Sequence, residues 1–198
     1  MFKQLRKQWH HFRMSQLSHA QLVHQVANGS NSAALEALFY LKERQHLQDG
    51  SLNGSQLVGA RLQHARLATA QLEAVNLSRA NLTHAYLGSS NLKKADLQQA
   101  CLQHANMRDA KLRQANLQAC DLSYAHLASA DMWCVNLQGA CLHQANLWGA
   151  NLKAANLRDA DLTGANMTHI QVDQDTILPD GRRWSSDVDW TIFTNDKK

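Results

Sequence analysis

Three histidines recur at intervals of twenty residues, at His64, His84 and His104, and Tyr124 continues the series. Cys101 lies three residues before His104, and imidazole nitrogens and thiolates are ligands that Zn²⁺ prefers. If residues twenty apart lie side by side, neighbouring imidazoles are placed to share an ion. A straight column sets its side chains in line, whereas a tetrahedral ion needs converging ligands. We therefore expect stacked neutral histidines without metal or cofactor, with a metal site on this face as the alternative.

If residues twenty apart stack, one face of the protein combines positive charge with tryptophan. Its members are Lys93, Lys94, Lys111, Arg113 and Lys153, together with Trp133. Glu73 and Asp131 dilute the charge. Such a face suits an anionic partner, including nucleic acid through its phosphates, although surface cations are also ordinary solvated groups. Trp148 would lie on the adjacent face, where an exposed tryptophan is a typical interface residue.

A five-residue period places these side chains. From Leu52 to Met167 every fifth residue is leucine or methionine, and the residue two positions earlier is nearly always alanine. Neither a helix nor a strand keeps every fifth residue on one side. A chain that turns through a quarter circle every five residues directs every fifth side chain toward the same central axis. Such a chain closes one coil every twenty residues. The predicted core includes Leu82, Leu102, Leu122, Leu142 and Leu162.

The repeated pattern A(D/N)LXX, seen in GANLKAANLRDADL, resembles that of the pentapeptide repeat proteins. The resemblance covers roughly residues 50 to 177. It implies an all-β fold, a right-handed quadrilateral β-helix (pentapeptide repeat solenoid) whose coils are about 4.8 Å apart. Free ends of such a stack need covering, because they expose apolar surface and unpaired strand edges.

The residues on either side of the repeats are typical of such covers. Before them, residues 32–49 are expected to form a capping helix with Asn31 or Ser32 as N-cap and Gly50 just past its end. Its apolar stripe contains Leu35, Leu38, Phe39 and Leu41. After the repeats, residues 178–198 form a C-terminal cap or tail. Its aromatic residues Trp184, Trp190 and Phe193 are expected to cover the last coil.

The N-terminal segment, residues 1–31, is basic and has no acidic residue. Phe2, Leu5, Trp9 and Phe12 recur at near-helical spacing between lysines and arginines, which predicts a basic amphipathic helix. It either folds over the cap or forms a basic tail. The alternatives are docking on an anionic membrane surface, a partner groove or nucleic acid.

Composition restricts the location and the chemistry. The first residues lack the apolar core of a signal peptide, no run is long enough to cross a membrane, and the spacing of Cys101 and Cys141 excludes a disulfide between them. We expect a cytoplasmic bacterial protein with free thiols. No phosphate-binding loop, HExxH, GxSxG or CxxC motif is present, so we do not expect an enzyme.

These features predict a non-enzymatic protein-interaction or scaffold module whose partner is an unknown protein. An alternative is a regulator of a DNA topoisomerase that imitates DNA, as some pentapeptide repeat proteins do. Residues 50 to 170 contain ten Lys and Arg against seven Asp and Glu, a net +3, which is the wrong sign for a DNA mimic. A homodimer through one end of the solenoid is also compatible with the sequence.

Overall fold

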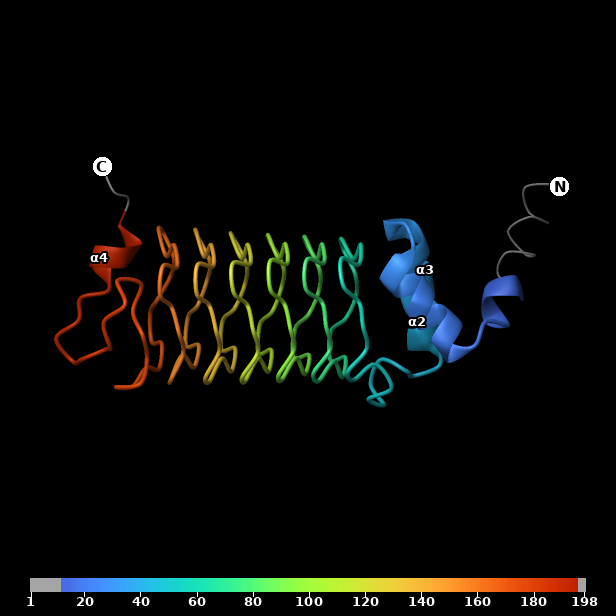
Figure 1. Ribbon diagram of the computed structural model, residues 1–198, viewed down its shortest axis with the longest axis horizontal. Coiled ribbons are helices and arrows are strands. Elements are labelled where there is room, and N and C mark those ends of the chain that lie inside the picture. The colour runs from blue at the N-terminus through green and yellow to red at the C-terminus, as the bar shows by residue number, and fades with distance from the viewer. Residues whose placement is uncertain (1–11, 196–198) are drawn as a thin grey trace.

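The protein is a rod with helices at its ends, as the computed structural model shows for residues 12–195 (Figure 1). Residues 12–15 are helical, and helices α2 (His19–Asn28) and α3 (Asn31–Glu43) lie at the N-terminal end of a stack of coils. The short helix α4 (Thr191–Thr194) lies at the C-terminal end. The stack between them is a β-helix solenoid, as expected from the repeats.

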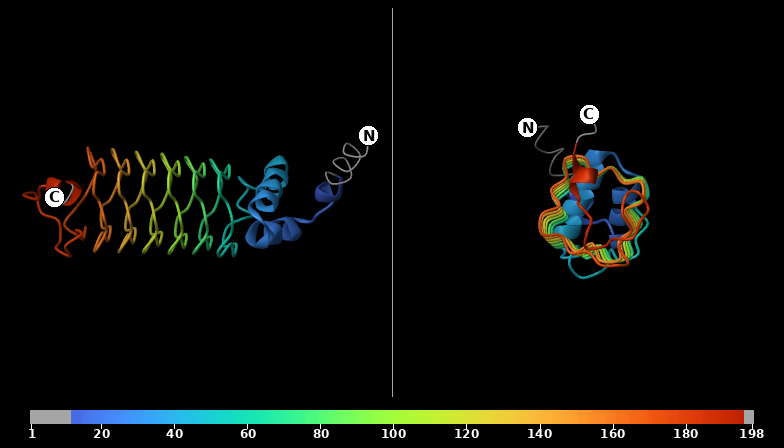
Figure 2. Two further views of the ribbon diagram at one scale, coloured as in Figure 1. Left: turned by 90° about the horizontal axis from the view of Figure 1, so that it is seen from above. Right: turned by 90° about the vertical axis from the view of Figure 1, so that its left-hand side faces the viewer.

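Successive coils pair in parallel with a fixed register of twenty residues. The bridges run from Gln56 with Asn76 to Asn151 with Gln171, so each coil contains four five-residue repeats. Seen end-on, the coils superimpose in one four-cornered outline (Figure 2). Each side pairs through single bridge residues, and the described coils contain no longer strand, because turns take up most of every repeat. The right-handed winding stays a prediction.

Each repeat ends in a turn that requires a left-handed residue. In the repeat centred on Leu57, Ala60 N–H donates to the Leu57 carbonyl at 3.1 Å, and Gly59 has a φ of 65°. Most equivalent positions are not glycine; His64, for example, has a φ of 62°. This conformation costs about 1–2 kcal/mol per non-glycine residue. Hydrogen bonds between coils offset it, such as that from His64 N–H to the Thr83 carbonyl at 3.0 Å.

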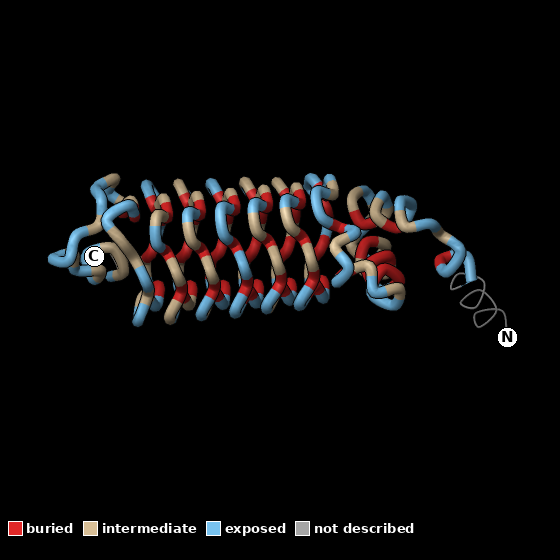
Figure 3. Tube along the Cα trace, turned by 90° about the horizontal axis from the view of Figure 1, so that it is seen from below, coloured by how far each residue is buried: buried red, intermediate tan, exposed pale blue. Residues whose placement is uncertain are grey.

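The core consists of leucine and alanine from all four sides of each coil, and buried positions recur in every coil along the rod (Figure 3). The leucines expected there are at most 1% exposed: Leu82, Leu102, Leu122, Leu142 and Leu162. Burying one leucine side chain contributes about 1.5–3 kcal/mol. The repetition of this contribution outweighs the strain of the turns.

Helix α3 starts and ends earlier than the sequence analysis placed it. Its N-cap is Ser30, whose hydroxyl accepts a hydrogen bond from Ala33 N–H at 3.3 Å, so neither Asn31 nor Ser32 is the cap. The helix ends at Glu43, well before Gly50, because Gln45 takes a left-handed conformation with a φ of 62°.

Within α3 the apolar stripe is divided between core and solvent. Leu38 and Leu41 are buried in the same hydrophobic cluster as the coils. Phe39, expected to cover the first coil, is 52% exposed. The predicted segment 1–31 also contains α2, whose Leu22 and Val26 are buried. Residues 1–11, with most of the expected amphipathic stripe, lie outside the described range.

At the C-terminal end, one extra residue interrupts the register after Gln171. Asn156 pairs with Ile177, twenty-one residues later, and the Asp173 carboxylate accepts the hydrogen bond of Ala154 N–H at 2.9 Å. Trp190 and Phe193 pack, partly buried, against the core. Trp184 is not among the residues that pack there.

Candidate interaction surfaces

The cationic face runs along one side of the rod. We define it as Lys93, Lys94, Lys111, Arg113, Trp133 and Lys153. The Arg113 guanidinium carbon lies 5.0 Å from the centre of the Trp133 ring, which is a cation–π contact. Arg113 Nε also lies 3.7 Å from an Asp131 carboxylate oxygen. Lys93 Nζ lies 3.8 Å from a Glu73 carboxylate oxygen.

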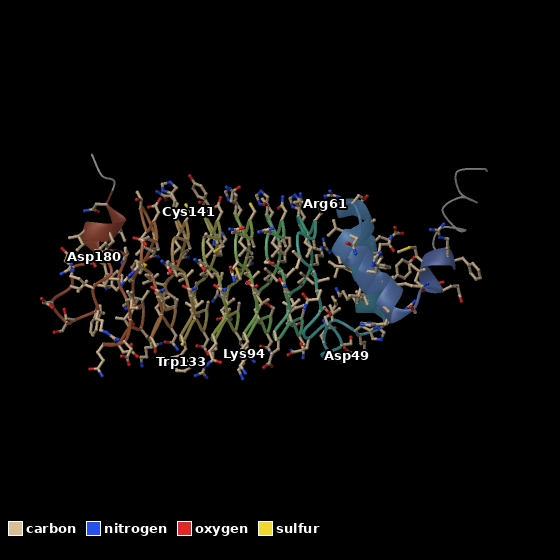
Figure 4. All side chains as sticks on the ribbon, in the orientation of Figure 1. Asp49, Arg61, Lys94, Trp133, Cys141 and Asp180 are labelled. Carbon is tan, nitrogen blue, oxygen red and sulfur yellow. The ribbon has the colours of Figure 1, made fainter. Side chains whose placement is uncertain are left out.

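Three lysines of this face keep their charge uncompensated. Lys94, Lys111 and Lys153 are exposed and make no ion pair with any residue between 12 and 195. Lys94 and Trp133 project from one side of the rod, opposite Cys141 (Figure 4). The coil register places these residues on one side of the rod, because the bridges from Asn91 to Lys111, Lys111 to Asp131 and Asp131 to Asn151 stack this side in successive coils. The resulting surface suits an anionic macromolecule.

The histidine column, His64, His84, His104 and Tyr124, occupies the left-handed turn positions of successive coils. Ring centres are separated by 5.1, 4.8 and 4.9 Å along the column, and neighbouring planes are inclined by 2°, 10° and 8°. The rings are therefore stacked face to face at the spacing of adjacent strands. His143 ends the stack with an edge contact to Tyr124 at 5.6 Å.

This stacking does not favour a metal centre. Lone pairs of imidazole nitrogens lie in the ring plane, so parallel rings direct them along parallel planes rather than to one point. Within residues 12–195, no three His, Cys, Asp or Glu residues are placed to hold an ion. Cys101 Sγ lies 3.2 Å from the Thr83 hydroxyl, and all four cysteines of the chain are free.

Trp148 differs from Trp133 in its environment. Trp148 is 46% exposed, and its ring makes an edge contact with His169, with ring centres 5.8 Å apart. Trp133 is half-buried under Arg113. The aromatic ring of the cationic face is thus held in place by Arg113, whereas the ring of Trp148, on the next side of the rod, is exposed to solvent.

Two adjoining hollows lie where α3 meets the first coils, and no motif in the sequence indicates them. Their volumes are about 350 and 370 Å³, and Lys42 and Arg66 line both. Phe39 of α3 lines one, and Tyr86 of the second coil lines the other. The only signal in the sequence was Tyr86, an aromatic residue in a position where Asn and Asp are common.

The repeat pattern, the twenty-residue register and the leucine core identify the family. A family model described as Pentapeptide repeats matches residues 44–79, 70–109, 110–149 and 140–173. The chain belongs to the pentapeptide repeat family. A comparison with curated proteins finds no match.

Solved pentapeptide repeat proteins are similar over part of the chain. HetL, described as involved in heterocyst differentiation regulation in the cyanobacterium Nostoc sp. strain PCC 7120, is 28% identical; the match covers 67% of this chain and 80% of HetL, with a TM-score of 0.35. A protein of the Arabidopsis thaliana thylakoid lumen is 24% identical over 59% of this chain and 71% of its own, with a TM-score of 0.35. QnrB1, described as a plasmid-mediated fluoroquinolone resistance protein, is 17% identical over 62% and 76%, with a TM-score of 0.27.

No helix among residues 12–195 is both long enough and apolar enough to span a membrane.

Proposed function

We propose that this pentapeptide repeat protein is a non-enzymatic interaction module that binds a partner protein through the cationic face. The observation that carries the proposal is the set of lysines that make no ion pair within residues 12–195, Lys94, Lys111 and Lys153, beside the fixed ring of Trp133. Charges steer the approach of a partner and a buried aromatic residue stabilises the complex.

A binding role agrees with how the reactive side chains are arranged. No histidine ring nitrogen within residues 12–195 forms a hydrogen bond with a serine, threonine or cysteine side chain, so the described part contains no nucleophile paired with a base. Burial raises the pKa of the Cys120 thiol far above its ordinary value, which keeps that thiol protonated and unreactive.

We extend the proposal to the ends of the rod and to location. Helices α2 and α3 act as the N-terminal cap, and any homodimer forms through a solenoid end. The free thiols fit a reducing compartment such as the cytoplasm. Residues 1–11 supply a basic segment for additional contact with nucleic acid or an anionic membrane.

The test is affinity capture from nuclease-treated lysate of the source organism, with the full chain as bait. The double variant Lys94→Glu/Lys111→Glu is expected to lose a protein that the wild type retains in stoichiometric amount. The matched control Arg79→Glu/Arg108→Glu makes the same charge change on other sides of the rod and should retain it. Equal retention by both variants would exclude the cationic face as the binding surface.

The same experiment addresses residues 1–11 without disturbing α2. Replacing Lys3, Arg6 and Lys7 by Gln removes the charge of the segment and leaves every described residue unchanged. Loss of the captured protein from this variant alone would assign recruitment to the segment. If the protein were a DNA mimic, the wild type should inhibit supercoiling by DNA gyrase. The net charge of +3 over residues 50 to 170 argues against a DNA mimic.

A further inference from the structure

The two hollows at the N-terminal end form one groove, the α3–coil groove, because Lys42 and Arg66 belong to the walls of both. Leu38 and Phe39 of α3 provide apolar surface on one side, and Tyr86 of the second coil does so on the other. The combined volume is in the usual range for a ligand site, about 300–1,000 Å³.

Two aromatic rings on this groove are unusually exposed. Phe39 and Tyr86 are both 52% exposed, although each adjoins well-packed elements. Among the described residues, the aromatic contact of Phe39 is an edge contact with Tyr40, with ring centres 5.4 Å apart. Exposed aromatic residues next to an apolar hollow are typical anchors for a partner's side chain.

One unpaired bridge position lies along the same groove. In the second coil, Tyr86 N–H donates to the Ala65 carbonyl and the Tyr86 carbonyl accepts from Leu67 N–H, both at 2.8 Å. Arg66 is the equivalent residue of the first coil, and neither its N–H nor its carbonyl has a backbone partner among residues 12–195. An unpaired donor and acceptor on one residue is the arrangement that an added strand needs.

The charges of the groove specify what kind of strand fits. Lys42 and Arg66 are exposed and make no ion pair or side-chain hydrogen bond with any described residue. Glu43 is the single acidic residue that lines the groove within residues 12–195. A ligand with carboxylates beside an apolar side chain would pair with both cations, whereas the basic residues 1–11 of this chain have the wrong charge.

We propose that the α3–coil groove binds an extended acidic peptide segment of a partner protein. The main chain of the peptide pairs with the Arg66 edge, an aromatic or aliphatic side chain packs between Phe39 and Tyr86, and flanking carboxylates contact Lys42 and Arg66. This inference rests on the proposed interaction function and assigns a second surface to it.

The test uses a displayed pool of random heptapeptides, panned against the full-length protein and counter-selected against the variant Lys42→Glu/Arg66→Glu. The expected peptides carry Asp or Glu around a large apolar residue. Synthetic copies should bind the wild type and lose at least tenfold in affinity with the double variant. The variant Phe39→Ser should weaken binding to a similar extent, and Phe39 is exposed enough that the fold should survive the change.

The control Lys94→Glu/Lys111→Glu changes the same charge on the cationic face and should leave peptide affinity within twofold. Far-ultraviolet circular dichroism checks that every variant is folded. The proposal is overturned if the pool yields no peptide that prefers the wild type, or if the selected peptides are neutral or basic. Peptides sensitive only to Lys94 and Lys111 would also overturn it, while still agreeing with binding at the cationic face.

The peptide selection and the affinity capture together distinguish the groove proposal from the proposal for the cationic face. If acidic peptides bind the groove but the captured protein does not depend on Lys94 and Lys111, the groove stands and the cationic face fails. If residues 1–11 compete for the groove, the variant with Lys3, Arg6 and Lys7 replaced by Gln will bind the acidic peptides more tightly than the wild type. If residues 1–11 exclude the acidic peptides from the groove in the wild type, this segment, and not a partner protein, occupies the groove, and the proposal is overturned.

Discussion

At the C-terminal end of the rod the chain continues the coil-to-coil hydrogen bonds after the repeats stop, whereas at the N-terminal end α3 covers the first coil mainly with side chains. Leu157 N–H donates to the Ile177 carbonyl and Ile177 N–H to the Ala155 carbonyl, both at 2.9 Å. At the other end, Gln71 N–H donates to the Leu47 carbonyl at 2.7 Å, while Arg66 has no such partner among the described residues.

The difference shows that the two ends are covered in different ways, by continued backbone pairing on two sides of the last coil and by side chains of a helix at the first coil. Continued backbone pairing saturates a strand edge, so it removes the template for another chain. A helix packed through leucine side chains excludes water from the core, yet it cannot pair with the edge along its whole length. At the Arg66 side of the first coil, the unpaired N–H and carbonyl therefore stay available to the peptide strand proposed above.

The largest expected effect comes from Leu41→Ala in α3, where the side chain is fully buried. The lost packing and the cavity should lower the free energy of unfolding by about 2–5 kcal/mol, measured by urea denaturation. Hydrogen exchange should quicken at the Gln71 amide. The matched change Leu178→Ala, equally buried at the C-terminal end, should leave the amide of Leu157 protected. Equal loss of protection at both ends would contradict the comparison.

The next effect is expected from Thr176→Val at the C-terminal end. The buried Thr176 hydroxyl donates to the Leu152 carbonyl at 3.0 Å. Its removal leaves the Leu152 carbonyl with only the hydrogen bond from Ala155 N–H, at 3.0 Å, and takes away the oxygen that accepts from Asp173 N–H. The free energy of unfolding should fall by about 0.5–1.5 kcal/mol. Thr163→Val is the control, because the Thr163 hydroxyl has no hydrogen bond with a described residue. A change no larger than that of the control would show that backbone pairing alone closes this end.

A smaller, pH-dependent effect is expected at Asp173. Partial burial raises the pKa of its carboxyl, but hydrogen bonds from Ala154, Asp175 and Thr176 outweigh this and hold the pKa below its ordinary value of 3.8. The unfolded chain then takes up the proton at a higher pH than the folded chain. The stabilisation is present above about pH 4 and is lost as the pH falls through the folded pKa.

Thermal unfolding of Asp173→Asn measures this effect. The variant should melt below the wild type at pH 7, and the gap should close as the pH is lowered toward the folded pKa. Asp159→Asn serves as the control, since the Asp159 side chain makes no contact of this kind in the described structure. A gap that persists unchanged at low pH would show that the carboxylate charge has no part in closing the end.

The smallest effect is expected from Glu73→Gln, which removes an ion pair between neighbouring coils. Both side chains are well exposed, at 38% for Glu73 and 44% for Lys93, so solvent screens the pair. The free energy of unfolding should change by less than about 0.5 kcal/mol in chemical denaturation. A loss above about 1 kcal/mol would mean that the outer columns help to hold the coils together, in addition to the core.

Much of the rod was predictable because each repeat uses the same local chemistry. Leucine at every fifth position indicated the core, and residues twenty apart, such as His84 and His104, were correctly expected to stack. The end of α3 was not predictable in the same way. The left-handed Gln45 that ends the helix has no glycine-like signature, and the exposure of Phe39 depends on the angle at which the helix meets the coil.

The sequence by itself determined the period, the inner columns and the twenty-residue register of the outer ones, because a five-residue repeat imposes the same turn and the same burial at each step. The α3–coil groove was decided only by the tertiary structure. Phe39 and Lys42 come from a helix, while Arg66 and Tyr86 come from two different coils, and no local pattern relates them. Their convergence follows from the packing of the apolar side of α3 against the first coil, which leaves Phe39 and the backbone of Arg66 uncovered.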